Sequence, residues 1–293
     1  MDFKAPVQKL YRKIKDYGKL VMFSHTIFSL SFALVSMLLA AGGPPRPSVL
    51  FWILVCFLGA RTGANAINRV IDAKIDSKNP RTAERQLPKG EMRSGEVVAF
   101  TAMCFLIMVL GAWMLNPLCL ALSPAALFLL IIYSYTKRFT WLCHLVLGVT
   151  CACAPVGAWL AVTGRFALLP LVMGAANTLW VAGFDIIYGC QDCDFDRANG
   201  LHSIPARFGV KNALFIAAGF HAVTLGLLVL VGLLSHRLGI LYSIGVVIIA
   251  VLFVAEYRMV SPGNLTSVNI ASYSVNQLVS LTLLVFGAVD ALI

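Results

Sequence analysis

The chain has 293 residues, of which 59% are hydrophobic and only 12% are charged. Together with a mean hydropathy of +0.85, this composition excludes a soluble domain and predicts an all-α integral membrane protein with several spans. In such a protein the placement of Lys and Arg matters more than the formal net charge of +10. We therefore expect the lipid bilayer as a partner, and no nucleic acid.

Apolar runs long enough to cross a bilayer recur along the whole chain, which we interpret as one polytopic domain, residues 1–293. We predict about nine transmembrane helices by this criterion. The predicted spans are roughly 20–41, 49–67, 97–115, 118–136, 141–162, 168–189, 212–234, 238–257 and 268–291.

The N-terminal segment, residues 1–19, mixes basic residues with Leu10, Ile14 and Tyr17. This pattern is typical of an amphipathic helix that lies on anionic lipid. His25 follows near the end of the first span, where it would either contact a ligand or hydrogen-bond to a neighbouring helix.

Nearly all Lys and Arg residues lie in the N-terminal segment and in or beside alternate loops; the exceptions are Arg46, Arg61, Arg165 and Arg237. By the positive-inside rule this asymmetry puts the N-terminus in the cytoplasm, and an odd number of spans puts the C-terminus outside. We therefore predict a multi-pass protein of the cell inner (plasma) membrane.

A row of metal-type ligands follows the second predicted span. Asn68, Asp72 and Asp76 recur every four residues, so on a helix they share one face, with roughly 6 Å between neighbouring Cβ atoms. Two acids this close repel each other unless a cation lies between them, and oxygen ligands suit Mg²⁺ better than Zn²⁺ or copper. Arg61 lies two turns earlier on the same face, where a guanidinium either pairs with a fixed acid or recognises an anionic substrate.

The loop after Asp76 is rich in cations, including Arg81 and Arg85. Basic cytoplasmic loops are common, so membrane topology alone would explain the charge. Its position directly after two carboxylates is what a diphosphate bound through Mg²⁺ would need. The fourth span ends similarly with Tyr133, Lys137 and Arg138, which either converge on one ligand or form an interfacial aromatic and positive-inside pair.

A second row with the same spacing follows the sixth span. It consists of Tyr188, Asp192 and Asp196, with Asp185 two turns before Asp192, and a basic loop containing Arg207 comes after it. Both acidic rows then open to the cytoplasm. Cys190 and Cys193 form a C-x-x-C pair beside Asp192, which we attribute to packing rather than to a zinc or redox site because no second pair lies at zinc spacing.

The last three spans contain few polar residues. We expect 212–234 and 238–257 to be scaffold, and Asn276 and Gln277 in the last span to form hydrogen bonds between helices or to contact substrate.

Two acidic rows, each followed by a basic loop, predict a site where Mg²⁺ ions clamp a diphosphate and neutralise it as a leaving group. A substrate with both a diphosphate and a need for the membrane is most simply a polyprenyl diphosphate. Loss of its diphosphate leaves an allylic cation that water would quench, and an apolar chamber among helices would exclude water.

These motifs resemble those of the UbiA family of membrane-embedded aromatic prenyltransferases, over nearly the whole chain. Asn68, Asp72 and Asp76 match the family's N-D-x-x-D-x-x-x-D motif, except that Arg69 replaces its first Asp. The second motif, Y-x-x-x-D-x-x-x-D, is matched without change, and Arg61 and the Y-x-x-x-K-R element at Tyr133 also have counterparts. His202 stands where a Lys is expected in the second loop.

Within the family, the loop R-T-A-E-R-Q-L-P-K-G and the spacing from Trp180 to Asp185 look most like 4-hydroxybenzoate polyprenyltransferases. The resemblance implies nine helices around a central cavity and transfer of a polyprenyl group to a ring carbon of that acid in quinone biosynthesis. It implies metal ligands at Asn68, Asp72, Asp76, Asp192 and Asp196. The resemblance also implies that the four carboxylates act in catalysis with Tyr133 and Tyr188. Substrate contacts are implied at Arg61, Asn68, Arg81, Arg85, Lys137, Arg138, Asp185 and Arg207.

Two other functions remain open from the sequence. A naphthoate acceptor, as in menaquinone synthesis, also has a carboxylate and a hydroxyl, so Arg61 does not separate it from 4-hydroxybenzoate. A cation or solute transporter predicts acids near the bilayer centre without basic loops beside them, whereas these acids cluster at the ends of the spans.

Overall fold

The computed structural model describes residues 17, 18, 20 and 27–293, and this part of the chain contains helices and no strand. The helices are α2 (Ile27–Ala41), α3 (Pro47–Asp76), α4 (Ser94–Leu115), α5 (Pro117–Thr136), α6 (Cys143–Thr163), α7 (Leu168–Gly189), η2 (Cys190–Asp192), α8 (Cys193–Ala198), α9 (Ile204–Leu234), α10 (Ile240–Met259), η3 (Ile270–Val275) and α11 (Asn276–Leu292). Most of the predicted segment 1–19, and His25, lie outside the described residues.

The predicted all-α membrane fold is confirmed. Within the described ranges, 8 helices are long and apolar enough to cross a membrane, and α2 contains a shorter apolar stretch, Leu30–Ala41. Two helices are longer than their predicted spans. Helix α3 continues to Asp76, because helical hydrogen bonding continues into residues too polar for the hydrocarbon. Helix α9 begins at Ile204, but its first turn is separated from the span by a kink at Gly209, whose φ of 80° and ψ of 159° are not helical.

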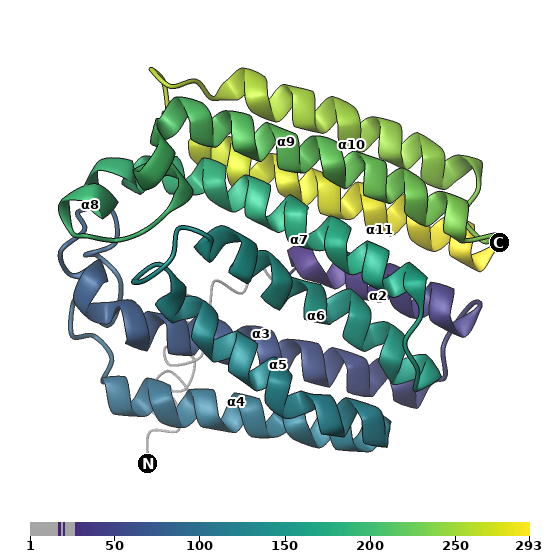
Figure 1. Ribbon diagram of the computed structural model, residues 1–293. Coiled ribbons are helices and arrows are strands. Elements are labelled where there is room, and N and C mark those ends of the chain that lie inside the picture. Colours follow the sequence, from purple (N-terminus) through teal and green to yellow (C-terminus); the bar gives the residue numbers. More distant parts are fainter. Residues whose placement is uncertain (1–16, 19, 21–26) are drawn as a thin grey trace, which may run out of the picture.

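The helices run side by side, with α3, α4 and α5 forming one part of the bundle and α9, α10 and α11 another (Figure 1). Helices α6 and α7 lie between them, and α2 packs against both α6 and α11. Small residues allow close approach of the helices: a Cβ added at Gly59 of α3 would lie 2.7 Å from the carbonyl oxygen of Cys104 on α4.

The polar ends of several helices meet at one end of the bundle. The loop between α3 and α4 lies there beside α8, as Figure 1 shows. The helix α5 ends at the same place, because the backbone N–H of His202, after α8, donates to the carbonyl oxygen of Lys137 at 2.7 Å. The two acidic rows therefore lie at the same end of the molecule.

A buried polar network crosses the scaffold helices beneath this end. The indole of Trp180 on α7 donates to Asn276 Oδ1 at 2.6 Å, and Asn276 Nδ2 donates to Glu256 Oε1 on α10 at 2.7 Å. His221 Nδ1 on α9 lies 3.2 Å from Glu256 Oε2. The predicted interhelical role of Asn276 is confirmed, and the spans expected to be plain scaffold contain a buried ionisable pair.

Candidate active site

The first acidic row lies on the last turns of α3, and the carboxyl groups of Asp72 and Asp76 are buried. Asn68 Nδ2 donates to Asp72 Oδ2 at 2.9 Å, as the four-residue spacing predicted, and also to Ser134 Oγ on α5 at 3.2 Å. The row is thus tied to the end of α5.

Arg138 follows α5 and joins it to the first row. Its guanidinium donates to Asp72 Oδ1 and to the carbonyl oxygen of Ile71, both at 2.9 Å. It also donates to the carbonyl oxygen of Ser134 at 2.6 Å. Arg138 therefore neutralises one acid of the row and holds two helix ends together.

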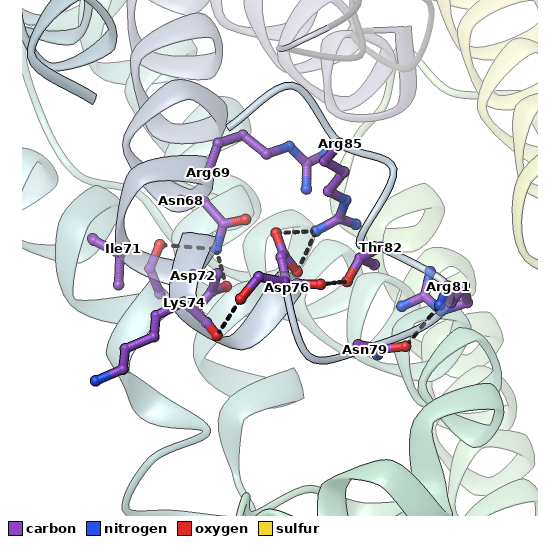
Figure 2. Close-up of polar contacts among 12 residues, drawn as sticks. Asn68, Arg69, Ile71, Asp72, Lys74, Asp76, Asn79, Arg81, Thr82 and Arg85 are labelled. Carbon is purple, nitrogen blue, oxygen red and sulfur yellow. Dashed lines mark hydrogen bonds and ion pairs between the residues drawn. The ribbon is translucent and has the colours of Figure 1, made fainter. Parts of the chain in front are cut away.

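The loop after α3 folds back over the site, because its side chains satisfy its own backbone. Thr82 Oγ1 donates to the carbonyl oxygen of Asp76 at 3.2 Å, and Asn79 Oδ1 accepts from the backbone N–H of Arg81 at 3.0 Å. Figure 2 shows the result: Arg85 turns toward Asp76, where its guanidinium donates to the two carboxylate oxygens at 2.8 and 2.7 Å. The first row thus lies under its own basic loop.

The same loop holds the second row. Arg81 Nε donates to Asp192 Oδ1 at 2.9 Å and its NH2 group pairs with Oδ2, while Asn79 Nδ2 donates to Oδ1 at 2.9 Å. The guanidinium carbon also lies 4.7 Å from the ring centre of Tyr188. Burial opposes the charge on Arg81, but the hydrogen bond to Asp192 and the nearby Tyr188 outweigh it and leave the pKa of the guanidinium raised.

Asp196, the other acid of the second row, is positioned by the start of α9. Ser203 precedes that helix and caps it, its Oγ accepting from the backbone N–H of Ala206 at 3.2 Å. The same hydroxyl donates to Asp196 Oδ2 at 2.9 Å. A helix cap therefore fixes the direction of this carboxylate.

The carboxylate and amide oxygens of the two rows are the hard ligands that Mg²⁺ prefers, so the donor chemistry fits this ion. Within the described residues no three His, Cys, Asp or Glu side chains converge on one point. Each row offers at most two carboxylates, so an ion bound there would need further oxygens from a substrate. Three of the four carboxylates are already paired with arginines.

The remaining predicted substrate contacts have different surroundings. Arg207 lies over the ring of Trp141, at 5.3 Å from its centre. Asp185 Oδ2 lies 2.7 Å from Nδ1 of His144, a residue of α6 that is 5% exposed. Sequence reasoning missed His144, although a histidine in an apolar span is a detectable signal.

A cavity of about 380 Å³ lies within the bundle, with walls mainly from α3, α5 and α6. Arg61, Asn65 and Tyr133 line it, and most of its other walls are aliphatic. The hydroxyl of Tyr133 donates to the carbonyl oxygen of Ala64 at 3.2 Å. Two of the predicted site residues, Arg61 and Tyr133, therefore line an apolar chamber.

Two other sequence features are explained by the structure. Cys190 and Cys193 are free and buried, and Cys193 Sγ contacts the carbonyl oxygen of Pro205 at 3.2 Å, as expected for packing residues. Arg69, which departs from the first motif, donates through Nε to the carbonyl oxygen of Leu20 at 3.3 Å. That side chain has a structural contact in place of a metal.

Comparison with known proteins agrees with this architecture. The chain is 32% identical over 256 residues to 4-hydroxybenzoate octaprenyltransferase of Vibrio campbellii, covering 86% of each chain. It is 30% identical over 255 residues to the enzyme of the same name from Tolumonas auensis, covering 87% of this chain and 86% of that one. The apo structure of a UbiA homologue from Aeropyrum pernix superposes with a TM-score of 0.83 at 33% identity, over 91% of this chain and 98% of that one.

A more distant structure shares the fold. The UbiA homologue from Archaeoglobus fulgidus bound to GPP and Mg²⁺ has a TM-score of 0.71 at 19% identity, over 95% of this chain and 100% of that one. The model of the UbiA prenyltransferase family matches residues 29–280. This integral membrane protein therefore belongs to the UbiA prenyltransferase family.

Proposed function

We propose that the protein transfers a polyprenyl group from polyprenyl diphosphate to a ring carbon of 4-hydroxybenzoate, with Mg²⁺ as cofactor and residues 1–293 acting as one domain. The observation that carries this proposal is the grip of a single loop on both acidic rows, through Arg85 on Asp76 and Arg81 on Asp192. The names of the Vibrio and Tolumonas relatives support the acceptor, and the ligands of the Archaeoglobus homologue support the diphosphate and the metal.

The paired charges explain how one site accepts a diphosphate together with cations. Asn68, Asp72, Asp76, Asp192 and Asp196 would hold Mg²⁺, which would supply positive charge to the departing diphosphate. Once cations neutralise the carboxylates, Arg81, Arg85 and Arg138 can give their N–H groups to the diphosphate oxygens. Lys137 and Arg207 add positive charge at the same end of the bundle. The arginines thus pair with carboxylates in the empty site and with the diphosphate in the loaded site, and no buried charge is left unpaired in either state.

The chamber would hold the prenyl chain and the allylic cation, which water would otherwise quench. In the transfer the bond between the first prenyl carbon and its diphosphate oxygen breaks, and the ring carbon of the acceptor bonds to that carbon and loses its proton. The apolar walls keep water from the allylic cation. Arg61 binds the acceptor carboxylate, while Tyr133, Tyr188 and Asp185 orient the ring and the cation.

The same proposal fixes the orientation of the protein. By the positive-inside rule, the basic loops favour a cytoplasmic location for the acidic rows and the N-terminus, with the protein in the inner (plasma) membrane. Water-soluble diphosphate would then leave on the side where the rows open.

The experiment is an acceptor comparison with the purified protein in lipid nanodiscs, Mg²⁺ and a radiolabelled polyprenyl diphosphate. We expect prenylated 4-hydroxybenzoate as the main product, and little product with 1,4-dihydroxy-2-naphthoate or with benzoate, which lacks the activating hydroxyl. Preference for the naphthoate would overturn the acceptor assignment, and absence of product with every aromatic acid would overturn the proposed reaction.

A further inference from the structure

A second cavity, of about 350 Å³, lies outside the catalytic rows at the same end of the bundle. We call it the basic pocket; it is bounded by the ends of α3 and α5 and by α8 with the residues after it. Lys74, Lys78 and Arg138 line it together with the apolar side chains of Ile71, Ile75 and Phe195. Among the described residues no carboxylate lines it.

The basic pocket occupies a different face of α3 from the acidic row. Lys74 lies about 160° around the helix from Asp72 and Asp76, and Lys78 follows two residues after the end of α3. In Figure 2 the side chain of Lys74 points away from the loop that contains Arg81 and Arg85. The two lysines are exposed, so their charges are available to a ligand from outside the catalytic site.

Arg138 forms the wall between the basic pocket and the acidic row. Its guanidinium is already shared between Asp72 and two backbone carbonyl oxygens. Its charge is therefore largely balanced, whereas the described structure gives the two lysines no ion pair. The pocket thus has a net positive charge, which favours an anionic ligand.

The height of the basic pocket in the membrane indicates which anion it meets. Helix α3 has 30 residues, which is about 45 Å, against roughly 30 Å for the hydrocarbon of a bilayer. If the span begins at Pro47, the hydrocarbon ends near Ile67 after about 20 residues. Ile71 and Lys74 then lie ~6–10 Å further, at the level of the lipid headgroups.

We propose that the basic pocket binds the phosphate headgroup of an anionic membrane phospholipid. Lys74 and Lys78 pair with the phosphate, as basic residues beside a span do. Ile75 and Phe195 contact the glycerol and the first acyl carbons, and Tyr135, also in the wall, takes the usual place of an interfacial tyrosine. A soluble phosphate or diphosphate has the same charge but no apolar part for these walls.

The experiment measures lipid retention by native mass spectrometry of the full chain, released from nanodiscs containing equal amounts of phosphatidylglycerol and phosphatidylcholine. We expect the wild type to retain phosphatidylglycerol. The double variant Lys74→Ala/Lys78→Ala should retain at least roughly tenfold less of this lipid. The matched control, Lys89→Ala/Lys211→Ala, removes two exposed lysines outside the pocket and should behave as wild type. Equal thermal unfolding midpoints for the three proteins exclude a folding defect.

Two results would overturn the proposal. Equal loss of phosphatidylglycerol in both double variants would mean that only overall charge attracts the lipid. In a second arm, inorganic phosphate or diphosphate is added at millimolar concentration to the protein in neutral detergent. Binding of either anion that is lost in the Lys74/Lys78 variant, together with no lipid preference, would assign the pocket to a soluble anion.

Discussion

Arg81 Nε lies 2.9 Å from Asp192 Oδ1, although 111 residues separate the two in the chain. The basic loop that follows the first acidic row thus holds an acid of the second. Because Arg81 engages both oxygens of Asp192, a metal ion would compete with the arginine for that carboxylate unless the arginine turned to another anion. A diphosphate is such an anion, so metal and substrate should bind together.

Replacement of Arg81 tests whether its guanidinium exchanges Asp192 for the diphosphate as its partner. A hydrogen bond to a charged group contributes about 1.5–3 kcal/mol, so we expect Arg81→Ala to raise KM for polyprenyl diphosphate by roughly tenfold or more. KM for the aromatic acid should stay the same. Lys89→Ala is the control, because Lys89 pairs with Glu84 on the exposed part of the same loop. An unchanged KM for the diphosphate would remove Arg81 from the substrate site.

A larger side chain at Gly157 would narrow the chamber. Gly157 lines the cavity and a Cβ there meets no atom within 4 Å. We expect Gly157→Leu to lower the turnover of long polyprenyl diphosphates by roughly tenfold or more, because the prenyl chain loses apolar contact with the chamber wall. Turnover of a ten-carbon donor should not change. Gly226→Leu is the matched control, because Gly226 also has open space but lies on α9 away from the cavity. Equal turnover of all donors would mean that the prenyl chain of the substrate does not occupy this chamber.

The buried network of Asn276 should govern stability rather than chemistry. Asn276→Leu leaves the indole N–H of Trp180 and a carboxylate oxygen of Glu256 without their bonds. We expect a loss of about 2–5 kcal/mol in the free energy of unfolding, since both groups are buried. Unfolding in detergent measures this loss of stability, and Gln277→Leu is the control. Equal unfolding midpoints for the two variants would contradict a structural role for the network.

The sequence was most informative where local geometry decides the structure. The four-residue spacing of Asn68, Asp72 and Asp76 is a property of one helix, and the bond from Asn68 to Asp72 follows from it. The apolar runs likewise indicate the spans, because a membrane leaves the backbone few alternatives to a helix.

The partners of the charged groups were beyond sequence reasoning. Nothing local to Arg81 and Arg85 tells which arginine binds which row, because the answer depends on how the loop folds back through Asn79 and Thr82. The pairing of His144 with Asp185 depends in the same way on the packing of α6 against α7. These contacts join segments far apart in the chain, and one sequence does not contain their distances.

Accessibility of a cysteine introduced at one loop position tests the predicted orientation, with labelling of the eight native cysteines as the background. Lys89 lies on the basic loop of the site and Arg165 on a loop at the other end of α6. In intact spheroplasts a membrane-impermeant maleimide should label Arg165→Cys and not Lys89→Cys, because the positive-inside rule puts the basic loop in the cytoplasm. Permeabilised cells should label both, with the wild type as the background. The reverse labelling pattern would mean that the protein has the opposite orientation in the membrane.

Calorimetric titration of the purified protein with a non-reactive polyprenyl thiodiphosphate tests the central claim, that the two acidic rows bind diphosphate through Mg²⁺. The wild type should bind the analogue with Mg²⁺ and at least tenfold more weakly in EDTA, and folded Asp72→Asn/Asp192→Asn should bind weakly in both conditions. Equal affinity of the wild type with and without Mg²⁺, or full Mg²⁺-dependent binding by the double variant, would contradict the account.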